Sequence, residues 1–533
     1  MGRHITQGID AVDQPITATA QGPIAANDLV KIDMGGWVQK VMEAYPVSAQ
    51  NSATGPTAAM GTAALGSNYG YGGANYLLGI KTAQALPDGG YALVYPGNGT
   101  TSSTGANLTL YGPNGVARQT VVLSASTTIR TMRVVRAGTD NLLVTWTEST
   151  DLRIAVVNYT TGAVVLASTS VGTSVQDEKG QSLATLANGE VVLAYDSGGN
   201  MVFKRFNASG VLQGVETQAE ATQTPKFITV LPLAAGGFII RWAKTTATQG
   251  NRMARFNAAG VLQGAVVGIS SGADAYDGAG TTYYAGAMEG KLIELANGNI
   301  VSTDISSATA QGFKVYDSTL TLLLTVSTGT GIATNQDNIQ LTAKYGGGFY
   351  LCGIGAVGAT AYYLREYNNA GQLLRVSTQG FSSGTRIIDR PGNGPVVATT
   401  SFIPGTPSSS MTMYSLQANL VIEPGSLVIF NLGSNAISSY WLEPLASGLI
   451  LSTWCVSSTV GQYHHLAFPG GASVLGVAQN AVALGQQVKV ATAGKLTMNQ
   501  TLTSPAFDRR ASTPPGTKGM TLGNNAVLNG ING

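Results

Sequence analysis

Short runs of alternating apolar and polar residues, each broken by a glycine turn, recur along most of the chain. The clearest pair is LATLANGEVVLAYDSGGNMVFKRFNASGVLQG at residues 183–214 and LPLAAGGFIIRWAKTTATQGNRMARFNAAGVLQG at residues 231–264. Each has two apolar runs around a glycine turn, then an alternating segment ending in Phe-Asn and a second turn before Val-Leu-Gln-Gly. Period-two alternation with Asn-Gly or Gly-Gly turns predicts antiparallel hairpins, so one unit corresponds to about four short strands.

Weaker copies of this unit extend the pattern in both directions. They occur at residues 85–95, 134–146, 294–303, 343–353, 387–400 and 442–454. Successive turn glycines lie 47 to 62 residues apart, at Gly89, Gly138, Gly189, Gly236, Gly298, Gly346, Gly394 and Gly448. A period near fifty with four strands per unit is typical of a β-propeller blade, because one blade alone cannot bury both of its faces. The pattern therefore predicts an all-β protein with a propeller of seven to eight four-stranded blades.

Aromatic residues recur at one position of the second apolar run. Trp146 and Trp242 occupy it, and Tyr95 and Tyr195 align with them. A large side chain at the same place in each unit indicates packing between neighbouring blades.

The repeats divide the chain into four predicted regions. Residues 1–45 contain a β-hairpin that turns near Gly35 and Gly36, and residues 46–76 form a linker rich in Gly, Ala, Ser and Thr. The propeller occupies residues 77–472, and residues 473–533 contain further short strands and an extended tail.

The two ends of the chain resemble a small β-module of tailed-phage virion proteins, such as head decoration proteins, head fibres and tail fibres. The N-terminal half of the resemblance is NDLVK at residues 27–31, continuing to Val41. The C-terminal half is LGVA at 475–478 and GQQVKV at 485–490, and the tail at 504–531 is similar to closing segments of such proteins. The resemblance implies that the propeller is inserted into one small β-domain built from both ends. The repeats themselves resemble propeller repeats of bacterial surface and adhesin-like proteins.

The amino-acid composition excludes some classes of binding partner. The 533 residues include 69 glycines, only 11% are charged, and the formal net charge is +2. Because the chain has almost no excess of positive charge, we do not expect nucleic acid as a partner. A hydrophobic fraction of 44% excludes a disordered chain, and no apolar run approaches the ~20 residues of a membrane-spanning helix.

Groups for catalysis or metal binding are scarce. The histidines are His4, His464 and His465, and the adjacent pair falls in an expected strand where neighbours point to opposite faces. Neither Cys352 nor Cys455 belongs to a metal or redox motif, and no nucleophile elbow, zinc-protease motif or phosphate-binding glycine loop occurs. We therefore expect no enzyme, no catalytic residue, no metal and no cofactor.

Binding candidates lie instead in two glycine-rich segments. Tyr69, Tyr71 and Tyr76 are in the linker, and Asp274, Tyr283 and Tyr284 are in a segment at 270–290 that lengthens one repeat interval. Exposed tyrosine rings can stack on sugars or bury against a partner subunit. The competing interpretation is that these rings pack their own loops onto the propeller and that Asp274 is a solvated turn residue.

Together these patterns predict a tailed-phage virion component, assembled in the host cytoplasm. Its expected partners are other virion proteins, further copies of itself and a host-surface glycan, with no membrane insertion. One alternative is a secreted adhesin or lectin-like protein, for which the N-terminal segment lacks the apolar run of a secretory signal. A second is a glycan-degrading enzyme, which needs a convergent carboxylate pair. Head, neck and tail-fibre positions are not distinguished.

Overall fold

The protein is all-β. The computed structural model describes residues 16–19, 24, 26, 29–32, 38–40, 81–96, 105–112, 116–126, 129–173, 181–221, 225–243, 250–269, 291–307, 310–330, 340–344, 346–354, 362–381, 386–389, 395–400, 410–416, 419–422, 428–431, 437–445, 450–456, 462–467, 474–478, 481, 487–491, 494–497, 518–522 and 525–529. Within these ranges every regular element is a strand, and no helix is present that could cross a membrane.

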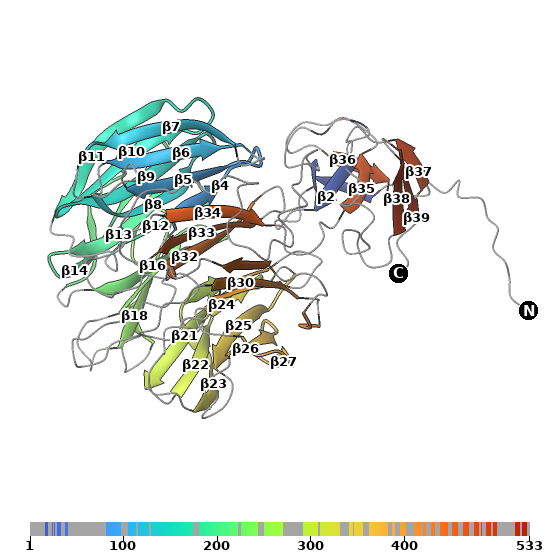
Figure 1. Cartoon of the computed structure of the whole chain (residues 1–533). Coiled ribbons are helices and arrows are strands. Elements are labelled where there is room, and N and C mark those ends of the chain that lie inside the picture. Colours follow the sequence, from blue (N-terminus) through green and yellow to red (C-terminus); the bar gives the residue numbers. More distant parts are fainter. Residues whose placement is uncertain are drawn as a thin grey trace, which may run out of the picture.

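Between residues 83 and 467 the described strands form seven four-stranded antiparallel sheets and one three-stranded sheet (Figure 1). The first four sheets comprise β4 (Ala83–Ala85), β5 (Tyr91–Pro96), β6 (Ala106–Tyr111) and β7 (Ala117–Ser124); β8 (Ile129–Ala137), β9 (Asn141–Glu148), β10 (Asp151–Asn158) and β11 (Val164–Thr173); β12 (Gln181–Thr185), β13 (Val191–Ser197), β14 (Asn200–Phe206) and β15 (Thr217–Glu220); and β16 (Lys226–Pro232), β17 (Phe238–Ala243), β18 (Asn251–Phe256) and β19 (Val267–Gly268).

The remaining sheets continue in the same order. They comprise β20 (Leu292–Glu294), β21 (Ile300–Ser307), β22 (Ala310–Tyr316) and β23 (Leu322–Thr330); β24 (Gln340–Ala343), β25 (Phe349–Ile354), β26 (Tyr362–Tyr367) and β27 (Leu373–Val376); β28 (Arg386–Ile388), β29 (Val396–Thr400), β30 (Ser410–Ser415) and β31 (Val428–Asn431); and the three-stranded sheet β32 (Ile437–Pro444), β33 (Ile450–Val456) and β34 (Gln462–Ala467).

The sheets are arranged side by side around an axis. The first strand of each sheet contacts the first strand of the next, from β4 through β28 to β32, and β32 contacts β4. At this closing contact the Thr82 and Thr453 hydroxyls lie 3.1 Å apart, and Glu443 accepts a hydrogen bond from the Ala85 N–H at 3.0 Å. Radially arranged four-stranded meanders are the architecture of a β-propeller.

The core consists of apolar clusters between neighbouring sheets. Phe203, Phe238 and Phe256 form a three-ring cluster between the third and fourth sheets, with centroids 4.7 to 5.2 Å apart. Phe313, Phe349 and Tyr367 repeat this cluster two sheets later, at 4.8 to 5.1 Å. Aromatic residues of one sheet therefore pack against aromatic residues of the next.

The turn glycines have the positive φ that a glycine hairpin turn requires. Gly89, Gly138, Gly189, Gly236, Gly298 and Gly346 all have φ between 61° and 90°. Positive φ is costly for residues with a Cβ, and the flanking strands pair antiparallel across these turns. Gly394 and Gly448 lie outside the described residues.

The second turn of each unit is fixed by a side-chain oxygen. Asn207 Oδ1 accepts from the Ser209 and Val211 N–H groups, and Asp317 Oδ1 does the same for Thr319 and Thr321. Asn158, Asn257, Asn368 and Asn419 make related contacts. A short polar side chain that binds nearby N–H groups stabilises such turns.

Leucine replaces glycine at the positive-φ position of two of these turns. Leu320 has φ 68° and Leu420 has φ 65°, whereas Gly210, Gly260 and Gly371 have φ of 76° to 80° in the corresponding turns. Both leucine side chains are buried. Apolar burial offsets the backbone strain, which explains how the repeat persists where its glycine is lost.

A separate sheet joins the two ends of the chain. It contains β1 (Ile16–Thr19), β2 (Leu29–Ile32), β3 (Val38–Lys40), β35 (Val474–Ala478) and β36 (Gln487–Ala491), in the order β1-β36-β35-β2-β3. Ile16 is opposite Val490, and Leu29 is opposite Val477. A three-stranded sheet follows, with β37 (Gly494–Thr497), β38 (Lys518–Leu522) and β39 (Asn525–Asn529). The strands of residues 16–40 thus pair with strands that lie beyond the propeller in the sequence.

Candidate functional site

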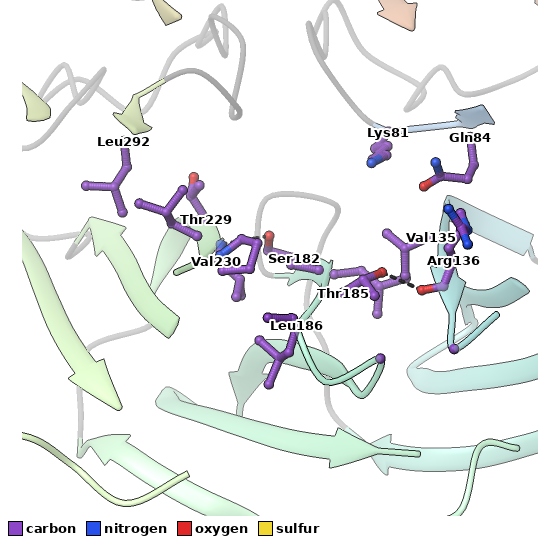
Figure 2. Close-up of a pocket in the computed structure, with 17 residues that line it drawn as sticks. Lys81, Gln84, Val135, Arg136, Ser182, Thr185, Leu186, Thr229, Val230 and Leu292 are labelled. Atoms are coloured by element: carbon purple, nitrogen blue, oxygen red, sulfur yellow. Dashed lines mark hydrogen bonds between the residues drawn. The ribbon is translucent and has the colours of Figure 1, made fainter. Parts of the chain in front are cut away.

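A cavity of about 550 Å³ lies against the inner strands of the propeller (Figure 2). Its walls come from β8, β12, β16 and β20, and from Lys81 and Gln84 at the start of the first sheet. Each wall is the first strand of a different sheet, so residues more than 200 positions apart in the sequence line one space. This volume is within the range of about 300–1,000 Å³ that is usual for small-ligand sites.

The charged lining of this first cavity is entirely cationic. Among the described residues of the lining, Lys81 and Arg136 are the charged ones, and none is a carboxylate. Within the described ranges, neither cation forms an ion pair. The cavity therefore presents positive potential to a ligand.

The Arg136 side chain is held only loosely by its neighbours. One of its terminal nitrogens, Nη2, is 3.5 Å from the carbonyl oxygen of Thr139. Its Nε is buried and makes no hydrogen bond to any part of the chain that is described. The Thr185 hydroxyl donates to the Arg136 carbonyl oxygen, which fixes the backbone at this position.

Hydroxyl and amide groups and apolar side chains complete the lining. Gln84, Ser182, Thr185 and Thr229 supply the polar groups. Figure 2 shows Lys81, Gln84 and Arg136 on one side of the space and Leu292 on the opposite side. The remaining apolar contacts come from Val135, Leu183, Leu186, Val230, Leu231 and Pro232.

A second cavity of about 980 Å³ adjoins the first through Leu292, which lines both. Its walls come from β20, β24, β28 and β32. It differs from the first in charge, because its lining mixes three acids with two bases: Glu294, Asp389, Glu443, Lys344 and Arg386.

Most of these charges have partners within the protein. Glu443 accepts hydrogen bonds from Trp441 Nε1 at 3.0 Å and from the Ala85 N–H, and Glu294 accepts from the Ala234 N–H at 2.7 Å. Lys344 forms an ion pair with the buried carboxylate of Glu366. Arg386 stacks on the Trp441 ring, with its guanidinium carbon 4.0 Å from the ring centroid. These charged side chains of the second cavity are therefore held by contacts within the protein.

The predicted binding residues cannot be placed relative to these cavities. Tyr69, Tyr71, Tyr76, Asp274, Tyr283 and Tyr284 all lie outside the described residues. The sequence analysis did not identify Lys81, Arg136, Arg386 or Glu443. Only 11% of the residues are charged, so a charged residue within an apolar strand is unusual. This is the signal in the sequence that could have identified them.

The predicted packing positions are buried as expected. Trp146, Tyr195 and Trp242 are each at most 1% exposed, whereas Tyr95 is only partly buried and packs against the cluster between the first and last sheets. Trp242 Nε1 donates to Glu220 at 3.2 Å, and Trp146 Nε1 donates to Glu148 at 3.4 Å. Burial raises the pKa of Tyr195 far above its usual value, and its hydrogen bond to Glu216 raises it further. These rings therefore serve the blade contacts.

The remaining chemistry-bearing residues add no second site. Cys352 is buried. His464 and His465 are adjacent on β34, opposite Thr453 and Ser452 of β33. In the part of the chain that the structure describes, no group of three or more His, Cys, Asp or Glu side chains is placed to hold a metal ion.

Comparison with known proteins gives structural similarity only. No family and no curated relative matches the sequence. The Dos1 propeller is similar over 73% of this chain and 93% of its own, with 13% identity and a TM-score of 0.42. The dihydro-heme d1 dehydrogenase NirN is similar over 72% of this chain and 74% of its own, with 11% identity and a TM-score of 0.42. A polysaccharide lyase, ulvan lyase, covers 76% of this chain and 95% of its own, with 9% identity and a TM-score of 0.41.

The expectation that the chain is not an enzyme is wrong. Similar solved structures include NirN, ulvan lyase, a streptogramin B lyase and a prolyl endopeptidase. The physical reason is that a fold can bring charged groups from separate sheets together, as the second cavity does with Asp389, Glu443, Lys344 and Arg386. Scarce histidine and the absence of local motifs say nothing about groups assembled in this way, since carboxylates and cations also perform acid–base chemistry.

Proposed function

We propose that this chain is a structural component of a tailed-phage virion. In this proposal a small β-module formed by both chain ends anchors an eight-bladed propeller to the particle. The propeller provides assembly contacts and attaches to a glycan of the host surface. Its partners are other virion proteins and further copies of the chain.

The observation that carries the proposal is the pairing of the two chain ends. β1 pairs with β36 and β2 pairs with β35, so a small sheet is completed only after the propeller has been traversed. The β2–β35 pairing joins the two segments that resemble virion modules, around residues 27–41 and 475–490, whereas β1 lies just before the first of them. An inserted propeller held at both of its ends is suited to display from a fixed base.

Eight blades are inferred from the closing contact. The three-stranded sheet β32–β34 follows seven four-stranded sheets, and its first strand contacts β4 of the first. Trp441 and Leu451 of this sheet pack with Tyr91 and Leu93 of the first sheet in one apolar cluster. Closure protects sheet faces that would otherwise be exposed.

Exposed apolar side chains support the assembly contacts. Pairs of valine or leucine occur at or just before the outer strands of successive sheets, and they are 40% to 57% exposed: Val164 and Val165, Val211 and Leu212, Val261 and Leu262, Leu322 and Leu323, and Leu373 and Leu374. Scattered apolar residues are normal on a surface, but this repetition at one position of the fold is typical of a contact surface.

The test is a mass-spectrometric inventory of particles purified from cells that produce the protein. We expect the intact chain at a fixed copy number per particle. Electron microscopy with an antibody against the propeller should then place it at one part of the particle. Absence from purified particles, with the protein instead released or attached to the bacterial surface, would overturn the virion assignment in favour of an adhesin.

A further inference from the structure

We propose that the first cavity is a binding site for an acidic saccharide, meaning a sugar unit that carries a carboxylate or sulfate group. The inference specifies the ligand class of the glycan attachment proposed above and rests on it. Lys81 and Arg136 are the groups that receive the anion.

The charge of the lining is the first argument. Lys81 and Arg136 approach one space from two neighbouring sheets, and the part of the wall that the structure describes contains no carboxylate. The carboxylates nearest in sequence are Asp88 and Asp140, and neither belongs to the lining. Because cations without a partner in a partly enclosed cavity attract counter-charge, an anionic group is favoured there.

The hydrogen-bonding state of Arg136 is the second argument. Its Nε is buried without an acceptor among the described residues, and its Nη2 makes a long contact of 3.5 Å to the Thr139 carbonyl oxygen. A buried donor without an acceptor is costly. A planar anion in the cavity can accept charge-assisted hydrogen bonds from the terminal nitrogens of the guanidinium group.

The rest of the wall selects a sugar over a simple anion. Ser182, Thr185, Thr229 and Gln84 offer hydroxyl and amide groups, whereas Leu292 and the neighbouring apolar residues offer a surface for C–H groups. A saccharide has both kinds of surface. The volume of about 550 Å³ also exceeds what a single inorganic ion needs.

The second cavity does not share these properties. Its lining contains Glu294, Asp389 and Glu443, which would repel an anion, and its lysine is paired with Glu366. We therefore assign the anion to the first cavity and use the contrast between the two in the test.

Isothermal titration of the purified full chain tests the assignment with methyl glucuronide as the probe. Methyl glucoside, which lacks the carboxylate, and sodium acetate, which lacks the sugar, are the comparison ligands. We expect the glucuronide to bind more tightly than either. We also expect its affinity to fall as ionic strength rises, because the attraction is screened by salt.

Variants locate the site. Lys81→Gln and Arg136→Gln should each weaken glucuronide binding by about tenfold or more, since each removes one charge-assisted hydrogen bond. Arg118→Gln is the matched control: it removes the same charge from the first sheet, but Arg118 pairs with Asp88 and does not line the cavity. Thermal unfolding of each variant verifies its fold. Should Arg136→Gln not fold, Lys81→Gln decides the question.

Several outcomes would overturn the inference. Equal affinity for the glucoside would remove the role of the anion, and equal affinity for acetate would remove the sugar subsite. Unchanged binding in Lys81→Gln, or an equal loss in Arg118→Gln, would place the anion elsewhere. Each of these results tests the cavity alone, because the virion proposal is tested separately by the mass-spectrometric inventory of purified particles.

Discussion

Gly236 and Gly237 lie side by side in one turn, yet they respond differently to a methyl group. Both have positive φ, of 90° and 82°. A Cβ on Gly236 would meet nothing within 4 Å, whereas a Cβ on Gly237 would lie 2.3 Å from the carbonyl oxygen of Phe256. That oxygen belongs to the last residue of β18, which is paired with Phe238 of β17. The clash is therefore between two strands of one hairpin.

The two substitutions should differ by the cost of this clash. Gly236→Ala places a Cβ on a residue with positive φ, which should lower the free energy of unfolding by about 1–2 kcal/mol. Gly237→Ala has the same backbone strain. In addition, it forces the backbones of β17 and β18 apart, which destabilises by about a further 1–3 kcal/mol, as in an overpacked core. We therefore expect about 1–2 kcal/mol for the first variant and about 2–5 kcal/mol for the second.

Differential scanning calorimetry of the full chain measures the difference, and hydrogen exchange localises it. Gly237→Ala should unfold at the lower temperature and lose amide protection in β17 and β18. Gly346→Ala and Gly348→Ala repeat the contrast in another sheet, because a Cβ meets nothing at the first and lies 2.3 Å from the Tyr367 carbonyl oxygen at the second. The reasoning is refuted if the two members of either pair are equally stable.

Two further variants test other parts of the argument. Hydrogen bonds from the Thr319 hydroxyl and then the Thr321 N–H lower the pKa of Asp317 below its usual 3.8, so its stabilising contribution is complete above about pH 4 and is lost as the pH falls through the lower folded pKa. Asp317→Asn keeps the side-chain oxygen seen at Asn207 and should remove this pH dependence in thermal unfolding between neutral pH and pH 2, whereas a retained dependence would contradict the assignment. At the closing contact, Glu443→Ala should destabilise by about 1–3 kcal/mol for each buried donor that loses its acceptor, and Glu443→Gln should cost less because it keeps one oxygen; equal melting temperatures for the two would count against that role.

Local conformational rules explain what could be predicted without coordinates. A glycine between two apolar runs indicates a turn with positive φ. Because such turns recur about every fifty residues, they predict a series of similar sheets. The rule fails where another energy compensates, as at Leu320 and Leu420, whose buried side chains replace glycine in the second turn. The predicted binding tyrosines remain predictions, because their segments lie outside the described residues.

The candidate site depended on tertiary structure. Lys81, Arg136, Ser182, Thr229 and Leu292 share one cavity although no two of them lie on the same sheet. No spacing in the sequence encodes this, because which inner strands are neighbours depends on how the sheets close around the axis. For the same reason, the sequence identifies Gly237 only as a turn residue, whereas the fold leaves no room there for a Cβ, which would lie 2.3 Å from the Phe256 carbonyl oxygen. The sequence by itself determined the repeating unit, since each hairpin is a local structure. Only the tertiary structure decided which charges face one another, because that depends on contacts between units.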